Sequence, residues 1–145
     1  MGFFKPNVKK MERDKDLNGL IEALNHKDLD VRRKAAGALA RLGDQKAVAP
    51  LIKILTDLYD PEIGKGLYLL GDVASALGEI GDKRAVKPIK LALERPYLGV
   101  VSYSPEDLLN PGAKMYRRVA EMNRPLNYFK EAAKEALEKI KTKES

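Results

Sequence analysis

Hydrophobic residues recur at helical spacing along most of the chain and group into pairs of stripes. The first stripe comprises Leu17, Leu20, Ile21 and Leu24. After a polar break at residues 25–30 a second stripe follows, formed by Val31, Ala35, Ala38, Leu39 and Leu42. This spacing of three and four residues predicts two amphipathic helices. Gly43 is expected to end the second helix in a left-handed cap, and Asp44 to cap the next helix.

The same pattern repeats downstream. When residues 31–55 are placed over residues 69–93, the identical positions include Ala36 and Ala74, Gly43 and Gly81, Asp44 and Asp82, and Pro50 and Pro88. A weaker third copy places Phe129, Ala133, Ala136, Leu137 and Ile140 over the stripe of the first unit. Self-similarity at a fixed spacing is typical of repeat architectures. The chain is therefore predicted to contain three helical pairs, with Pro50 and Pro88 in the first turns of their helices.

Three blocks carry a resemblance to a known family. They are DVRRKAA at residues 30–36, LGDQKAVAPLI at 42–52 and GDKRAVKPI at 81–89. These blocks resemble HEAT-like repeats of the bilin-lyase type, over residues 16–93 well and over 128–141 in part. The resemblance implies an all-α fold, a short right-handed α-solenoid of the armadillo/HEAT type, whose second helices line a concave face. It also implies a binding scaffold, including one that assists chromophore attachment.

A single domain at residues 1–145 accommodates this pattern. We expect an N-terminal lead-in at 1–15, repeats at about 16–43, 44–81 and 82–141, and an insertion at about 95–127 inside the third repeat. The second unit is also longer than the first, because residues 63–80 stand where residues 31–42 do. Either this helix gains nearly two turns, with a kink at Gly71, or it breaks near Gly64, Gly66 or Gly71; we favour the longer helix.

The insertion concentrates prolines and tyrosines. Four of the eight prolines fall there, and so do Tyr103 and Tyr116. Ser104 and Pro105 predict the start of a short helix, and Ala113 to Met122 predict another. Long insertions in compact domains are often functional. The alternative is that this segment covers the end of the solenoid, which would otherwise expose apolar surface.

The second helices also predict a partner-binding face. At 100° per residue, Arg33, Gly37 and Ala40 lie opposite the apolar stripe of the first unit. The equivalent positions are Gly71, Ser75 and Gly78 in the second unit and Glu131, Glu135 and Glu138 in the third. The small residues predict a groove that admits a partner helix or the insertion; alternatively, they only permit helices of the solenoid to stack. The glutamates are either a binding edge or a solvated face.

Positive charge is concentrated in one short segment. Residues 46–82 carry more acidic than basic groups, whereas Lys83, Arg84, Lys87 and Lys90 follow with no acid up to residue 93. With Arg117 and Arg118, this basic patch is a candidate site for phosphates or nucleic acid. The concave face is partly acidic, which disfavours duplex binding there, and a solvated helix face is the alternative reading of the patch.

Composition limits the chemistry. The 145 residues contain no cysteine and one histidine, His26, which excludes a disulfide framework, a cysteine zinc site and a histidine-only metal site. No nucleophile elbow, phosphate loop or metal-ligand spacing is present, so we expect no catalytic residue, no metal and no cofactor. The first residues are too short for a secretory signal, and no apolar run reaches membrane-spanning length, which predicts a cytoplasmic chain without a membrane partner.

These observations favour a non-enzymatic scaffold that binds a protein partner through Arg33, Gly71, Ser75, Gly78, Tyr103, Tyr116, Glu131 and Glu135. The net charge of +6 supports an alternative, phosphate or nucleic-acid binding through the basic patch. The resemblance supports a third possibility, an accessory subunit in cofactor or chromophore attachment.

Overall fold

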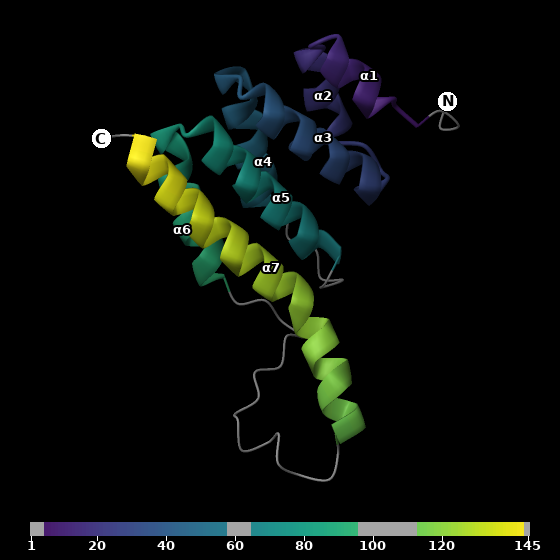
Figure 1. The fold of residues 1–145 in the computed structure, drawn as a ribbon, viewed down its shortest axis with the longest axis vertical. Helices are drawn as coiled ribbons and strands as arrows, with labels where there is room; N and C mark the ends of the chain where they lie inside the picture. Colours follow the sequence, from purple (N-terminus) through teal and green to yellow (C-terminus); the bar gives the residue numbers. More distant parts are fainter. Residues whose placement is uncertain (1–4, 58–64, 96–112, 144–145) are drawn as a thin grey trace.

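Helices account for all regular structure in the described part of the chain. The computed structural model describes the backbone of residues 5–57, 65–95 and 113–143, and the side chains of these residues except 65 and 113–122. In chain order the helices are α1 (Val8–Arg13), α2 (Leu17–Ala23), α3 (Leu29–Leu42), α4 (Val48–Asp57), α5 (Lys65–Ile80), α6 (Val86–Glu94) and α7 (Ala113–Lys143) (Figure 1). Two 3-10 turns, η1 (Gln45–Ala47) and η2 (Lys83–Ala85), lead into α4 and α6.

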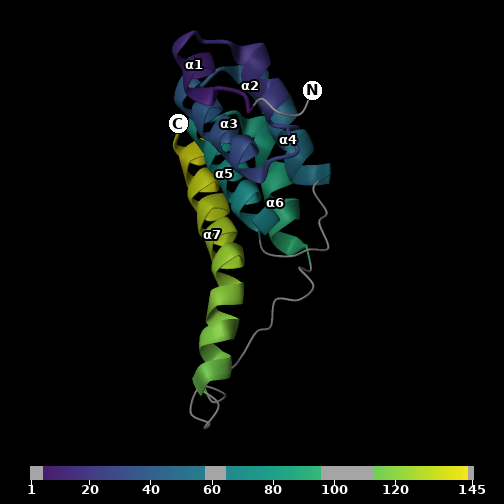
Figure 2. The same ribbon diagram turned by 90° about the vertical axis from the view of Figure 1, so that its right-hand side faces the viewer.

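The helices form a two-layered, all-α solenoid of three pairs. The pairs are α2 with α3, α4 with α5, and α6 with α7, and the two members of each pair pack against one another. The second helices α3, α5 and α7 lie side by side in one layer, while α4 and α6 contact each other in the other layer (Figures 1 and 2). Fully buried leucines such as Leu39, Leu55 and Leu77 fill the space between the layers. The expected all-α solenoid-like fold is confirmed.

The repeated turns have the predicted geometry. Gly43 and Gly81 adopt positive φ angles of 64° and 77°, the left-handed conformation that favours glycine at a helix C-terminus. Asp44 and Asp82 follow, and each side chain accepts a hydrogen bond from the backbone N–H two residues later. Two short local signals therefore fix where each helical pair ends and the next begins: a Gly-Asp dipeptide, and a proline in the first turn of the following helix.

Helix α5 passes through Gly66 and Gly71 without interruption. The longer helix that we favoured is observed, and the alternative break at Gly66 or Gly71 is wrong. Gly71 is buried under α7, where a Cβ atom would lie 2.5 Å from the ring of Tyr128. The glycine therefore serves the close packing of two helices and does not mark a break.

The largest difference from expectation concerns α7. It is one helix of 31 residues, from Ala113 to Lys143, with Pro125 in its interior. We expected a helix at residues 113–122 within the insertion, separate from the last repeat helix, and the proline in between is not a barrier to the continuous helix. Good helix formers such as alanine, lysine, arginine and methionine dominate residues 113–122, and Pro125 itself is buried.

The insertion predicted at about 95–127 thus overlaps this helix. Its C-terminal part is the beginning of α7, which projects beyond the other helices in both views (Figures 1 and 2). The helix predicted at Ser104 lies outside the described residues.

Candidate partner-binding groove

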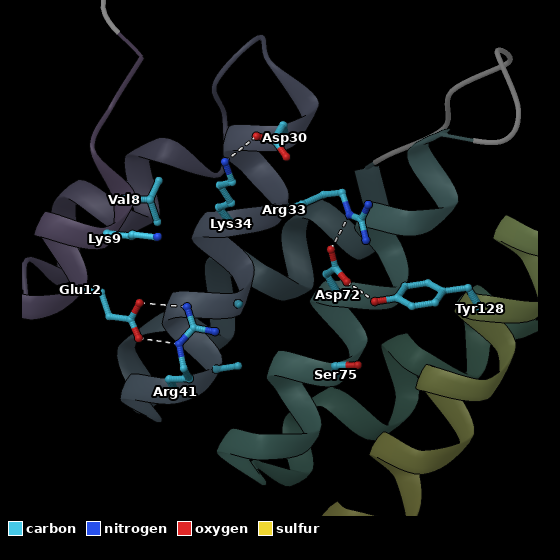
Figure 3. Close-up of a pocket in the computed structure, with 12 residues that line it drawn as sticks. Val8, Lys9, Glu12, Asp30, Arg33, Lys34, Arg41, Asp72, Ser75 and Tyr128 are labelled. Atoms are coloured by element: carbon cyan, nitrogen blue, oxygen red, sulfur yellow. Dashed lines mark hydrogen bonds and ion pairs between the residues drawn. The ribbon is translucent and has the colours of Figure 1, made fainter.

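A groove crosses the layer of second helices at its N-terminal end. Its volume is about 410 Å³. One wall belongs to α1, the floor to α3, and the other wall to α5 and α7 (Figure 3). The lining residues, in chain order, are Val8, Lys9, Glu12, Asp30, Arg33, Lys34, Gly37, Ala40, Arg41, Asp72, Ser75 and Tyr128.

The floor of the groove follows from the amphipathic pattern of α3. Val31, Ala35, Ala38 and Leu39 are buried on one side of this helix. Arg33, Gly37 and Ala40 occupy the opposite side at intervals of four and three residues, and all three line the groove, as the periodicity predicts.

Arg33 is held in place by the neighbouring helices. Its Nε donates to Oδ2 of Asp72 on α5 at 2.6 Å, and Oδ1 of the same carboxylate accepts from the hydroxyl of Tyr128 on α7 (Figure 3). The guanidinium carbon lies 5.1 Å from the ring centre of Tyr68 and 5.8 Å from that of Tyr128, within the range of cation–π attraction. The two rings are tilted by 57° with centres 5.3 Å apart. These four side chains, the Arg33 cluster, join three helices.

The cluster shifts the titration of its members. The hydrogen bond that Arg33 donates to Asp72 raises the pKa of Arg33, so this guanidinium stays charged. Burial raises the pKa of the Tyr128 hydroxyl, and the hydrogen bond to Asp72 raises it further. Tyr128 therefore remains a neutral donor at physiological pH.

A second ion pair closes the other side of the groove. Arg41 donates from Nε and Nη2 to the two carboxylate oxygens of Glu12 on α1, at 2.5 and 2.9 Å. This forked arrangement lowers the pKa of Glu12, chiefly through the hydrogen bond from Arg41. It also attaches the lead-in segment to α3. Sequence reasoning missed Glu12, Arg41, Tyr68 and Tyr128, and nothing local marks residues whose partners lie far away along the chain.

Two of the predicted partner-binding residues are not accessible. A Cβ on Gly78 would lie 2.7 Å from Cα of Ala136, and Gly71 is covered by Tyr128. Both glycines are buried between α5 and α7. The expectation of an open small-residue groove along α5 is therefore wrong for Gly71 and Gly78, because α7 occupies it. Ser75 is exposed and lines the groove above α3.

The remaining partner-binding candidates lie elsewhere. Glu131 and Glu135 are exposed on α7, outside the groove. Glu135 pairs with Lys139 at 3.3 Å, and Lys139 also pairs with Glu79 of α5. Tyr103 lies outside the described residues, and Tyr116 belongs to α7 with a side chain that is not described. The structure thus brings Arg33 and Ser75 together and leaves the glutamates separate.

The basic patch lies on the other layer. Lys83, Arg84, Lys87 and Lys90 are exposed on η2 and α6. Arg84 turns back onto Asp82, with Nη2 2.8 Å from Oδ2, so part of the charge is neutralised locally. Arg117 and Arg118 are in α7, but their side chains are outside the described set. The groove and the patch are therefore distinct surfaces.

Two kinds of site are absent from the described part of the chain. No group of three or more histidine or acidic residues there is arranged to hold a metal ion. In the same residues, no helix has both the length and the apolar character needed to cross a membrane.

Comparison with known proteins identifies the repeats. A family model described as HEAT repeats matches residues 17–102, which is more than half of the chain. The match covers the helical pairs α2 with α3 and α4 with α5, and it includes α6. It does not separate bilin-lyase-type repeats from others. No curated protein matches the chain.

Proposed function

The chain belongs to the family of HEAT-repeat proteins, and from this we propose that it is a non-enzymatic scaffold that binds a protein partner on its second-helix layer. HEAT repeats commonly mediate protein–protein interaction. Solenoids use the surface formed by successive equivalent helices for binding, because stacking leaves one layer available along its length. The partner-binding surface proposed here is the groove over α3, together with the exposed positions on α5 and α7.

The groove is the observation that carries the proposal. Its walls come from four helices, so its shape depends on the whole assembly of the repeats. The Arg33 cluster and the pair between Glu12 and Arg41 hold charged side chains on its two sides. Partners bind more tightly to side chains that are already ordered, because less conformational entropy is lost on association.

Tyr103, Tyr116, Glu131 and Glu135 complete the proposed binding surface. Tyrosine is enriched where proteins meet, since it combines apolar area with a hydroxyl that hydrogen-bonds. Helix α7 connects the groove, through Tyr128, to the segment that carries Tyr116. We infer that a partner too large for the groove alone extends along α7.

Affinity capture with quantitative mass spectrometry tests the proposal. Gly37→Gln and Ser75→Gln fill the groove, while Ala49→Gln makes a similar change at an exposed site of α4. A partner recovered by wild type and Ala49→Gln should be depleted with both groove variants. Tyr103→Ala tests the insertion separately. Recovery of the same partner by every variant would show that this surface is not the binding site.

Phosphate or nucleic-acid binding is a second candidate with its own observation. Lys83, Lys87 and Lys90 are exposed at intervals of four and three residues on η2 and α6. Binding of this kind weakens steeply with salt, because it releases counterions. A double variant, Lys87→Glu with Lys90→Glu, should abolish retention of labelled DNA at low salt. If wild type itself retains neither DNA nor RNA there, this candidate is eliminated.

A further inference from the structure

Acidic and basic side chains in the groove differ in accessibility. At the Arg33 pair, the side chain of Asp72 is 16% exposed and that of Arg33 is 38% exposed. At the second pair, Glu12 is 24% exposed and Arg41 is 63% exposed. In both pairs the carboxylate is the more covered member and the guanidinium the more accessible one. At these two pairs, a molecule entering the groove therefore meets the guanidinium group before the carboxylate.

The guanidinium groups retain donors for a ligand. Arginine carries five N–H donors in a planar fork. The two recorded bonds to Glu12 use Nε and Nη2 of Arg41, while its Nη1 extends over Gly37, 3.4 Å from where a Cβ on that glycine would lie. Asp72 and the two tyrosine rings fix the plane of Arg33 in a similar way. Both forks are thus oriented before a ligand arrives.

The positions of the two arginines on α3 define the ligand further. Arg33 and Arg41 are eight residues apart on α3, so their Cα atoms are separated by a rise of about 12 Å along the helix. Gly37 lies midway, half-buried and without a side chain, and the guanidinium of Arg41 reaches back over it. An extended chain covers about 12 Å in roughly four residues, and a helix covers it in two turns.

We propose that the groove docks an acidic segment of a protein partner. Two carboxylates of this segment bind the guanidinium groups of Arg33 and Arg41, which stand at either end of the groove floor. This inference rests on the proposed scaffold function and specifies the chemistry of its partner. Arginine suits such contacts because its fork matches a carboxylate with two parallel hydrogen bonds. Lys9 and Lys34 on the rim add attraction that steers an acidic chain into place.

The charge balance favours separate carboxylates over a continuous phosphate chain. The lining contains four basic and three acidic residues, a net charge of only +1. Nucleic-acid binding gains most of its affinity from neutralising many successive phosphates. Asp30 on the rim is exposed and is paired with Lys34 at 2.8 Å, so the positive charge of Lys34 is partly neutralised. Two separate arginine side chains, each bonded to a carboxylate of the groove, instead suit a ligand with two separate carboxylates.

Fluorescence anisotropy with a defined probe tests the inference. The probe is a fluorescein-labelled polyglutamate peptide of about six residues, long enough in extended form to reach both arginines. We expect wild type and the control Ala49→Gln to bind it alike. Gly37→Gln obstructs the floor without changing the charge, and should weaken binding about tenfold. Arg41→Lys keeps the charge but loses the fork, and should weaken it several-fold.

The outcomes separate this inference from the scaffold proposal. Equal binding of the peptide by wild type and Gly37→Gln would overturn the inference, and so would the absence of binding to wild type. Tighter binding of an oligothymidylate that is lost in Gly37→Gln would also overturn it, by assigning the groove to nucleic acid. If a captured partner still depends on Gly37 while polyglutamate does not bind, only the acidic assignment fails. If no captured partner depends on the groove, the scaffold proposal itself fails.

Discussion

The close contact between α5 and α7 can be tested with a matched pair of glycine substitutions. Gly78 and Gly37 both lie inside helices, where replacement by alanine ordinarily stabilises a protein by about 0.5 to 1 kcal/mol. At Gly78 the new Cβ would lie 2.7 Å from Cα and 2.8 Å from Cβ of Ala136 on α7. Since carbon atoms pack at about 3.5 to 4.0 Å, the two helices would have to separate by roughly 1 Å.

The magnitude follows from these distances. Overpacking of this kind costs about 1 to 3 kcal/mol. The obstructing atoms include backbone, which cannot rotate away, so the cost should fall in the upper part of that range. After the gain in helix propensity, we expect Gly78→Ala to lose about 1 to 2 kcal/mol of unfolding free energy. At Gly37 the nearest atom is the flexible end of Arg41, at 3.4 Å. Gly37→Ala should therefore gain about 0.5 to 1 kcal/mol.

Urea denaturation followed by far-UV circular dichroism measures both variants. Opposite changes in the midpoint, with unchanged slopes, are the expected result. In thermal unfolding each kcal/mol corresponds to about 4 °C for a domain of this size. If Gly78→Ala stabilised the protein as much as Gly37→Ala, α7 would not lie against α5 at this distance. That result would refute the conclusion that α7 covers the small residues of α5.

Three further predictions concern caps and titration. Gly43→Ala forces alanine into the left-handed region at φ 64° and should cost about 1 kcal/mol, measured by urea denaturation. Because the pKa of Tyr128 is raised in the folded state, its contribution to the free energy of unfolding is complete below about pH 10 and declines as the pH rises further. The Tyr128→Phe variant should therefore lose less of this free energy than wild type between about pH 9 and 11. The pKa of Glu12 is lowered in the folded state. Its contribution to the free energy of unfolding is therefore present above the ordinary pKa of 4.5 and declines as the pH falls through the folded-state pKa. The Glu12→Gln variant should lose less of this free energy than wild type from about pH 7 to pH 3. Equal losses in variant and wild type would contradict either titration argument.

Much of the fold could be predicted from sequence because its signals are local. The stripe from Val31 to Leu42 fixes α3, and Gly43 with Asp44 fixes the turn that follows. The same signals at Gly81 and Asp82 repeat the result one unit later. Each of these features depends on residues within one or two turns of a helix, which is the range over which periodicity and capping act.

The remainder depends on contacts between distant residues. The pair of Glu12 and Arg41 spans 29 positions, and the bond between Tyr128 and Asp72 spans 56. No spacing rule connects such residues before the helices are stacked. The continuity of α7 was also hidden, because Pro125 is by itself a signal for a helix boundary.

The repeat offset explains why the predicted face is only partly exposed. Arg33 leans toward α5, where it meets Asp72. Gly71, which holds the equivalent position in the second unit, faces α7 in the same manner and is covered by Tyr128. The position opposite the apolar stripe is thus partly a surface for stacking on the next helix. Ser75, the equivalent of Gly37, remains exposed in the groove.

Carbodiimide coupling can locate a bound partner on the scaffold. This reagent joins a lysine amine to a carboxylate that it already contacts, so the linked residues can be identified by mass spectrometry of the protein with a captured partner. We expect links from Lys9 and Lys34, on the rim of the groove, to aspartate or glutamate of the partner. Links from Lys87 and Lys90 with none from Lys9 or Lys34 would contradict this expectation.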